Sequence, residues 1–283
     1  MALRYAYNTN GCAHHRLEDA LELIAEAGYD GVALTVDWQH FDPFAPDFEG
    51  RAEGLARRLR ELGLGVVIET GARFLLDPRH KHEPTLISPE REGRKKRIEF
   101  LKRCIDLCHA CAGETTSFWA GAPRPGVDAA EAWRWLQEGV YEVVGYAKGN
   151  GVEVALEPEP GMLVQTLDDW RRIAAIPGIV CPLFLALDVG HCLVTGERDP
   201  AEAVREFAPH LGTVSIEDMK RGVHEHLPFG RGDIDVPSVL RALQETNFQR
   251  LVCVELSRES HRTHEAIPEA ITWLKRQEAL LDR

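Results

Sequence analysis

Three consecutive stretches decide the fold of this chain: VEVALEPEP (152–160), LDDWRRIAAI (167–176) and LFLALDVGH (183–191). The first and third contain short apolar runs that each end at a carboxylate, which is typical of buried strands. The middle stretch has the apolar spacing of an amphipathic helix. A strand, a helix and a second strand in this order predict a parallel βαβ unit.

The same alternation extends in both directions along the chain, without a linker rich in Pro, Gly or Ser to divide it. Its 283 residues match the ~250 residues of one (β/α)₈ barrel. The pattern therefore predicts a single TIM-barrel domain over residues 1–283. We expect strands at 3–9, 31–36, 65–70, 115–119, 153–157, 183–188, 213–216 and 251–256, and helices at 17–28, 51–63, 92–110, 129–151, 167–176, 200–209, 236–246 and 266–281.

Composition excludes several classes of protein. Hydrophobic residues make up 44% and charged residues 28% of the chain, so disordered and collagen-like structures are excluded. With 33 basic and 45 acidic residues, the formal charge is −12, which opposes binding to nucleic acid. No apolar run reaches the ~20 residues of a membrane span, and the N-terminus lacks the apolar core of a signal peptide. We expect a cytoplasmic protein without a membrane partner.

The cysteines favour reduced thiols, because their number, seven, is odd and their spacing is irregular. Cys104, Cys108 and Cys111 form the one cluster. Their i, i+4, i+7 spacing lies on one helical face, so buried core thiols are preferred over the alternative of a metal or redox site.

Catalytic groups of such barrels lie at the carboxyl ends of the strands and in the loops that follow. Glu157, Asp188 and Glu255 each end an apolar run at this position. Three carboxylates at one barrel mouth repel one another, so a divalent cation is the natural compensation. The alternative is that they pair with arginines, namely Arg73, Arg231 or Arg258.

Histidines follow two of these strands. In the motif DVGH, Gly190 allows a turn that brings His191 back over Asp188. His224 and His226 are spaced so that both face one way if their segment is extended. The glycines at 230 and 232 predict a tight loop after them.

With these motifs in order, the chain resembles the xylose isomerase-like TIM-barrel superfamily, whose members include sugar epimerases, inosose dehydratases and the endonuclease IV group. The resemblance covers essentially the whole chain. It rests on four motifs in strands five to eight: ALEPEP (155–160), ALDVGH (186–191), HLPFGRGDIDVPSVLRAL (226–243) and LVCVEL (251–256).

This resemblance implies that Glu157, Asp188 and Glu255 bind a divalent metal, with Mn²⁺ expected and Mg²⁺, Co²⁺ or Zn²⁺ as alternatives. The superfamily usually has a ligand histidine in a strand-seven motif VHIKD, but this chain reads VSIED, with Ser215 in place of that histidine and Glu217 in place of the lysine. We expect His226, which matches a ligand histidine of the endonuclease group, to complete the site. The alternatives are a water molecule in that position or no tightly held metal.

Five residues are expected to bind a substrate, and the loop over residues 69–89 is long enough to cover the barrel mouth. This loop carries Arg79, Lys81 and His82 as further polar groups, and Trp38 and Phe74 are further candidates for an apolar wall. The five substrate-binding candidates are His191, His224, Arg73, Trp119 and Ser215.

The resemblance and the strand-end residues together predict a metal-dependent sugar or cyclitol isomerase or epimerase. Glu157 and Glu255 would remove and return a proton next to a carbonyl, through an enediolate. Loss of a β-hydroxyl from the same intermediate would give a dehydratase. The further alternatives are a metal-dependent phosphodiesterase like endonuclease IV and a metal-free barrel that binds a metabolite. A homo-oligomer stays open.

Overall fold

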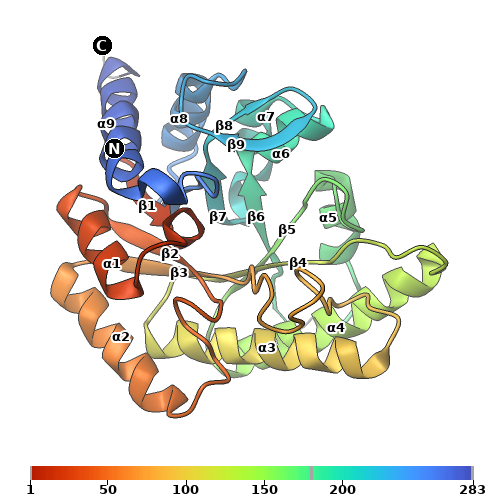
Figure 1. Ribbon diagram of the computed structural model, residues 1–283. Helices are drawn as coiled ribbons and strands as arrows, with labels where there is room; N and C mark the ends of the chain where they lie inside the picture. The colour runs from red at the N-terminus through yellow and green to blue at the C-terminus, as the bar shows by residue number, and fades with distance from the viewer. Residues whose placement is uncertain (1, 179–180, 282–283) are drawn as a thin grey trace.

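The structure is a computed structural model that describes residues 2–178 and 181–281, and its centre is a closed barrel of eight parallel strands (Figure 1). Each strand pairs with its neighbours in the order β1-β10-β7-β6-β5-β4-β3-β2, and β1 closes the barrel by pairing with both β10 and β2. The predicted (β/α)₈ barrel is confirmed. The strands are β1 (Arg4–Asn8), β2 (Gly31–Thr35), β3 (Gly65–Glu69), β4 (Thr116–Trp119), β5 (Val154–Glu157), β6 (Phe184–Asp188), β7 (Leu211–Ile216) and β10 (Leu251–Val254).

Helices surround the barrel, and the ends of all but α6, which was not predicted, agree with the predicted ranges to within a few residues. That residues 1–283 form a single domain stays a prediction, and both of its ends lie outside the described residues. The helices are α1 (Leu17–Glu26), α2 (Phe48–Leu62), α3 (Arg91–Ala110), α4 (Ala129–Gly149), α5 (Leu167–Ala174), α6 (Val189–Thr195), α7 (Pro200–Phe207), α8 (Val236–Glu245) and α9 (Thr263–Leu281).

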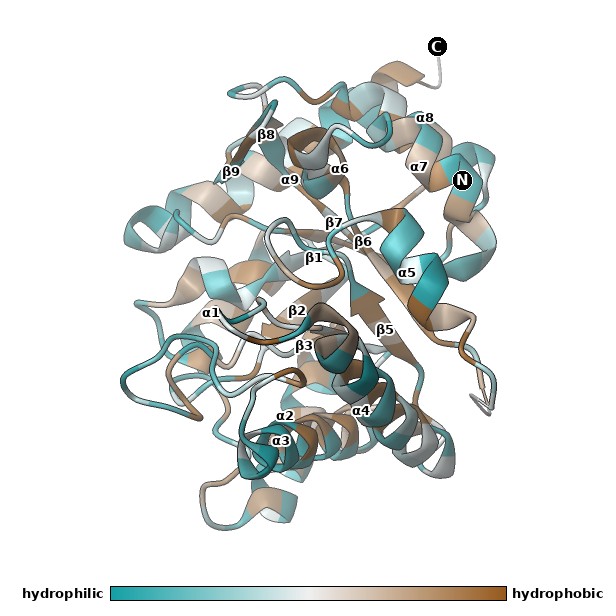
Figure 2. Cartoon of the chain, turned by 90° about the vertical axis from the view of Figure 1, so that its right-hand side faces the viewer, coloured by the Kyte–Doolittle hydropathy of each residue, from teal (hydrophilic) through white to brown (hydrophobic). Residues whose placement is uncertain are grey.

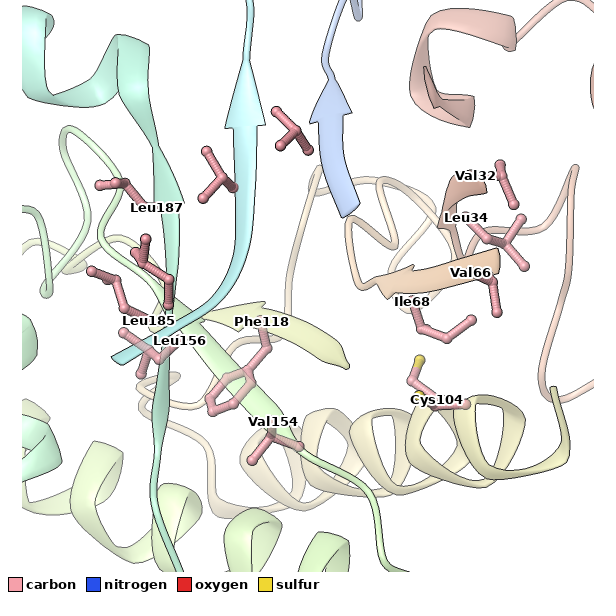
Figure 3. Close-up of a cluster of buried hydrophobic side chains, with 14 of the residues drawn as sticks. Val32, Leu34, Val66, Ile68, Cys104, Phe118, Val154, Leu156, Leu185 and Leu187 are labelled. Atoms are coloured by element: carbon pink, nitrogen blue, oxygen red, sulfur yellow. The ribbon is translucent and has the colours of Figure 1, made fainter. Parts of the chain in front are cut away.

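The main core lies between the outer face of the barrel and the helices. Apolar residues concentrate on the strands, and hydrophilic residues on the outer sides of the helices (Figure 2). Figure 3 shows Val66 and Ile68 of β3 beside Cys104 of α3. Because strand side chains alternate, the residues between them point into the barrel, where Val67 packs with other inward-facing side chains.

The cysteine cluster follows this packing. Cys104 and Cys108 are fully buried on α3, as predicted, whereas Cys111 follows the end of the helix and is half-buried. All seven cysteines are free thiols. Burial raises the pKa of Cys108 to about 11, so it stays protonated at neutral pH.

Two elements were not predicted. Helix α6 starts directly after β6, where the sequence predicted a simple turn, because an Asp188 carboxylate oxygen accepts the backbone N–H of His191 and caps the helix. A hairpin of β8 (Asp218–Lys220) and β9 (Val223–Leu227) follows β7 and lies beside α6 (Figure 1). In the described part of the chain, no helix has the length and apolar character needed to cross a membrane.

Candidate active site

A cavity of about 570 Å³ opens at the carboxyl ends of the barrel strands, within the size range of small-molecule pockets. Two of the predicted site residues do not line it: Asp188 is 2% exposed and lies next to His191, and Ser215 is half-buried on β7, paired in register with Asp188. The other predicted residues all line the cavity: Glu157, Glu255, His226, His191, His224, Arg73 and Trp119.

Glu157 ends β5 and lies on the cavity wall near Glu159. Its Oε1 is 3.6 Å from Nδ1 of His191. Burial raises the pKa of Glu157 well above its ordinary value, and the carboxylates of Glu159, Glu255 and Asp188 add to this rise. A carboxyl group in this environment resembles the tuned acids and bases of enzymes.

His191 lies in α6, directly after β6, and its ring contacts His224 of the hairpin. Its Nδ1 lies 3.0 Å from the carbonyl oxygen of Pro158, which can only accept, so Nδ1 carries the proton. Its Nε2 lies 3.0 Å from Nε2 of His224, so one of the two rings donates this hydrogen bond and the other accepts it. Nε2 of His191 is also 3.5 Å from Asp188. Burial by itself would raise the pKa of Asp188, but the neighbouring His191 and His226 keep it below its ordinary value.

His226, on β9, lies between two carboxylates. Its Nδ1 is 3.9 Å from Oε2 of Glu217, and its Nε2 is 3.9 Å from Oε1 of Glu255. Burial lowers the pKa of His226, but Glu255 and Glu217 outweigh it and raise the pKa to about 10. Asn10 donates a hydrogen bond of 2.8 Å to Glu255 and orients it. As predicted, β9 is extended, and His224 and His226 both line the cavity.

The buried polar atoms at the base of the site fit a cation. Among the described residues, Oδ2 of Asp188, both carboxylate oxygens of Glu217 and Nδ1 of His226 are buried without a hydrogen-bond partner. Unpaired buried carboxylates cost several kcal/mol unless a cation or protons neutralise them. The described residues offer three groups whose ligand atoms lie within 4.8 Å of one another: His191 with His224 and His226, Glu157 with Asp188 and His191, and Asp188 with His226 and Glu255.

Two of the arginines proposed as alternative partners are engaged elsewhere. Arg73 lies 3.8 Å from Asp37, and Arg258 lies 2.8 Å from Glu225. Arg231 is exposed and is not among the cavity-lining residues. Glu157, Asp188 and Glu255 therefore have histidines and Asn10 as their near partners, and a cation fits them better than an arginine does. Arg73 offsets part of the charge of Glu69.

Three acidic residues to which the sequence assigned no role also lie at the site: Glu69, Glu159 and Glu217. Glu69 ends β3 and lines the cavity, and burial together with Glu255 raises its pKa to about 7. Glu217 follows β7 and is fully buried beside Asp188 and His226. Glu69 and Glu217 stand at strand ends, which was the available signal, but only the fold shows that their carboxyl groups are buried near other acidic groups.

The loop over residues 69–89 covers one side of the cavity. Arg97 of α3 holds it by donating hydrogen bonds to the carbonyls of His82 (2.6 Å) and Pro84 (2.8 Å). The Arg97 guanidinium also stacks over Trp119, at 4.6 Å from the ring. The loop contributes Arg73, Lys81 and His82 to the cavity lining. Phe74 of the same loop and Trp38, which follows β2, are 48% and 68% exposed and do not line the cavity.

Comparison with known proteins agrees with this arrangement. A family model described as a xylose isomerase-like TIM barrel matches residues 21–277. The chain is 25% identical to L-ribulose 3-epimerase of Mesorhizobium japonicum over 83% of its own length and 74% of that protein. It is 24% identical to an inosose dehydratase of Clostridium perfringens over 44% of this chain and 47% of that one. The crystal structure of the IolI protein with a bound zinc atom superposes with a TM-score of 0.76 at 20% identity, over 97% of this chain and 98% of that one.

Proposed function

The chain belongs to the xylose isomerase-like TIM barrel family, and on this basis we propose that it is a metal-dependent isomerase or epimerase of a sugar or cyclitol. One observation carries the proposal: Glu157 and Glu255 line the same cavity from strands that are separated by β6 and β7 around the barrel. A substrate between them would present different faces to the two carboxylates.

The two glutamates act as the proton-transfer groups. One removes the proton from the carbon next to the substrate carbonyl, giving an enediolate, and the other returns a proton to the opposite face or to the neighbouring carbon. Asn10, which donates to Glu255, keeps that carboxylate directed at the cavity.

Glu157, Asp188, His226 and Glu255 would hold a divalent cation, and their oxygen-rich set suits Mn²⁺, with Mg²⁺, Co²⁺ and Zn²⁺ as alternatives. When bound, such a cation polarises a carbonyl and lowers the pKa of the adjacent C–H group. His191, His224 and Arg73 would contact substrate hydroxyls, and Trp119 would pack against the apolar face of a sugar ring. Ser215 was predicted to bind substrate but does not line the cavity. It would contact substrate only after a movement or through a bridging water.

Solvent deuterium exchange tests the two-base step. The Mn²⁺-loaded protein, offered ketoses and inososes in D₂O, is expected to incorporate deuterium at a carbon next to the carbonyl. Glu157→Gln and Glu255→Gln should each lose this incorporation, whereas Glu225→Gln, which removes the same charge outside the cavity lining, should retain it. Turnover by the unmodified protein without any solvent deuterium in the product would contradict the two-base route.

The match to an inosose dehydratase favours one second candidate, a dehydratase that uses the same site. After the same proton removal, the enediolate would expel a β-hydroxyl group, and the product would be lighter than the substrate by one water. Mass spectrometry of the products distinguishes the two reactions, since an isomer or epimer keeps the substrate's mass.

A further inference from the structure

Glu217 is a buried acid that the proposed reaction does not use. It is 0% exposed, and neither of its carboxylate oxygens has a hydrogen-bond partner among the described residues. It follows the end of β7 directly, two positions after Ser215. Burying a carboxylate without hydrogen-bond partners lowers the stability of the fold, so we expect Glu217 to have a function at this position.

The nearest complementary group to Glu217 is the ring of His226. Oε2 of Glu217 lies 3.9 Å from Nδ1 of His226, and this Nδ1 is itself buried without a partner. The other ring nitrogen, Nε2, faces Glu255 at 3.9 Å. The imidazole thus has one nitrogen towards Glu217 and the other towards the group formed by Asp188, His226 and Glu255.

This orientation matches what a ligand histidine needs. A histidine that binds a metal through one nitrogen usually donates its other N–H to a carboxylate, which fixes the tautomer and the ring orientation. A proton on Nδ1 directed at Glu217 would leave the lone pair of Nε2 free. The 3.9 Å separation is longer than a hydrogen bond, so the two groups have to move closer for this contact to form.

The fold makes room for this carboxylate at one position. A Cβ atom on Gly190 would lie 2.3 Å from Oε1 of Glu217 and 2.6 Å from Sδ of Met219. A glycine in the first turn of α6 therefore lets the helix close over Glu217. The pocket that buries Glu217 is formed by α6 on one side and by the residues after β7 on the other.

We propose that Glu217 is a positioning residue that orients the ring of His226 through Nδ1. It thereby allows His226 of the hairpin to act as the metal ligand that related sequences have on β7, at the position of Ser215. The inference rests on the proposed function, because it requires that His226 bind the metal. It makes the two departures in the sequence VSIED (214–218) a linked pair: one removes a histidine from β7, and the other supplies the carboxylate that orients its replacement on β9.

Metal titration of single variants tests the inference without relying on turnover. Mn²⁺ and Co²⁺ are titrated into the full-length, metal-free protein, and Co²⁺ binding is followed by its visible absorption spectrum. Glu217→Gln is expected to weaken binding about 10–100-fold, as is typical when the carboxylate behind a ligand histidine is lost. Glu217→Asp keeps the charge but shortens the side chain, and it should also weaken binding. Glu225→Gln, on the same strand as His226, is the charge-matched control and should bind as the unmodified protein does.

A double variant separates positioning from direct ligation. If Glu217 acts through His226, the combination of Glu217→Gln with His226→Ala should bind no more weakly than His226→Ala alone. Losses that add in the double variant would overturn the inference, as would unchanged affinity in Glu217→Gln. Thermal melting without metal checks that each variant is folded. A protein that binds none of these ions would instead overturn the proposed function, so the two failures are distinguishable.

Discussion

Buried charge dominates the chemistry of single residues at the barrel mouth. Glu157 and Glu217 both have raised pKa values because burial disfavours the charged carboxylate, and Asp188 adds to the effect in each case. Histidines offset part of this charge, since His226 lies within 3.9 Å of Glu217 and Glu255. The metal-free protein therefore carries an electrostatic cost at its own site.

That cost has a pH dependence that Glu217→Gln should reveal. The unfolded chain loses the Glu217 proton near the ordinary pKa, whereas the folded protein holds it to higher pH, so stability falls as pH rises between the two values. Glutamine does not titrate. We therefore compare the melting temperatures of Glu217→Gln and the unmodified protein in EDTA at a series of pH values. The melting temperature of the variant minus that of the unmodified protein should become larger from about pH 5 to about pH 8. Each kcal/mol of difference in unfolding free energy corresponds to about 2–4 °C.

The control for this experiment is Glu225→Gln, which removes a half-exposed carboxylate. Its melting temperature relative to the unmodified protein should stay nearly constant over the same pH range. A Glu217→Gln variant that becomes relatively less stable as pH rises would show that the Glu217 pKa is not raised.

The strand-end rule found Glu157, Asp188 and Glu255 from sequence, because each charge interrupts an apolar run. The sequence assigned Glu217 no role in the site, although it stands at a strand end, because VSIED is too short to show that position 217 is fully buried. The relevance of Glu217 depends on the distance to His226, nine residues further along the chain, and spacing alone does not define that distance.

At the scale of elements, the hairpin β8–β9 positions His224 and His226 over the cavity. Asp218 anchors its return loop, since one carboxylate oxygen accepts the N–H of Gly230 at 2.9 Å and the other that of Ile234 at 3.1 Å. Gly232 fits closely beneath it, because a Cβ there would lie 2.4 Å from the Met219 carbonyl oxygen.

Asp218→Ala should therefore weaken both the fold and the site. Two part-buried backbone N–H groups lose their partner, which costs about 0.5–1.5 kcal/mol for each hydrogen bond, and His226 loses its support. Urea unfolding measures the first effect and Mn²⁺ titration the second. Asp233→Ala, which removes one bond to the exposed Arg221 N–H on the same hairpin, should cost less in both measurements. Equal losses in the two variants would show that Asp218 has no special role.

The loop over residues 69–89 depends in the same way on Arg97 of α3. Arg97→Lys keeps the charge but loses the planar group that bonds the carbonyls of His82 and Pro84 and stacks on Trp119. Amide hydrogen exchange in this loop should become faster, while exchange in α8, on another side of the barrel, stays unchanged. Unaltered exchange in the loop would mean that its own contacts suffice to hold it.

The eight barrel strands, of four to six residues, were predicted because each is an apolar run between turn signals. The main helices were predicted because their apolar spacing extends over two or more turns. Helix α6 was not predicted because it has only seven residues and begins directly after β6. Asp188 is therefore both the carboxylate at the end of β6 and the N-cap of α6. The hairpin was predicted only as an extended tract, since β8 has three residues and too few side chains to show alternation.

For the whole molecule, barrel closure brings the carboxyl ends of distant strands into one cavity. Glu69, Glu157 and Glu255 come from segments up to nearly two hundred residues apart. Even so, Glu255 adds to the raised pKa of Glu69, and both Glu255 and Glu69 add to the raised pKa of Glu157. The formal charge of −12 thus has a local concentration at the barrel mouth. We propose that a bound divalent cation neutralises part of it.

Metal analysis of the protein tests this central claim most directly. Protein purified without chelators should contain one equivalent of a divalent metal per chain, and protein stripped with EDTA should regain it from Mn²⁺ with a higher melting temperature. Asp188→Asn, which keeps the shape of a proposed ligand but not its charge, should bind the ion much more weakly. The absence of stoichiometric metal, together with no stabilisation by Mn²⁺, Co²⁺, Mg²⁺ or Zn²⁺, would contradict the account.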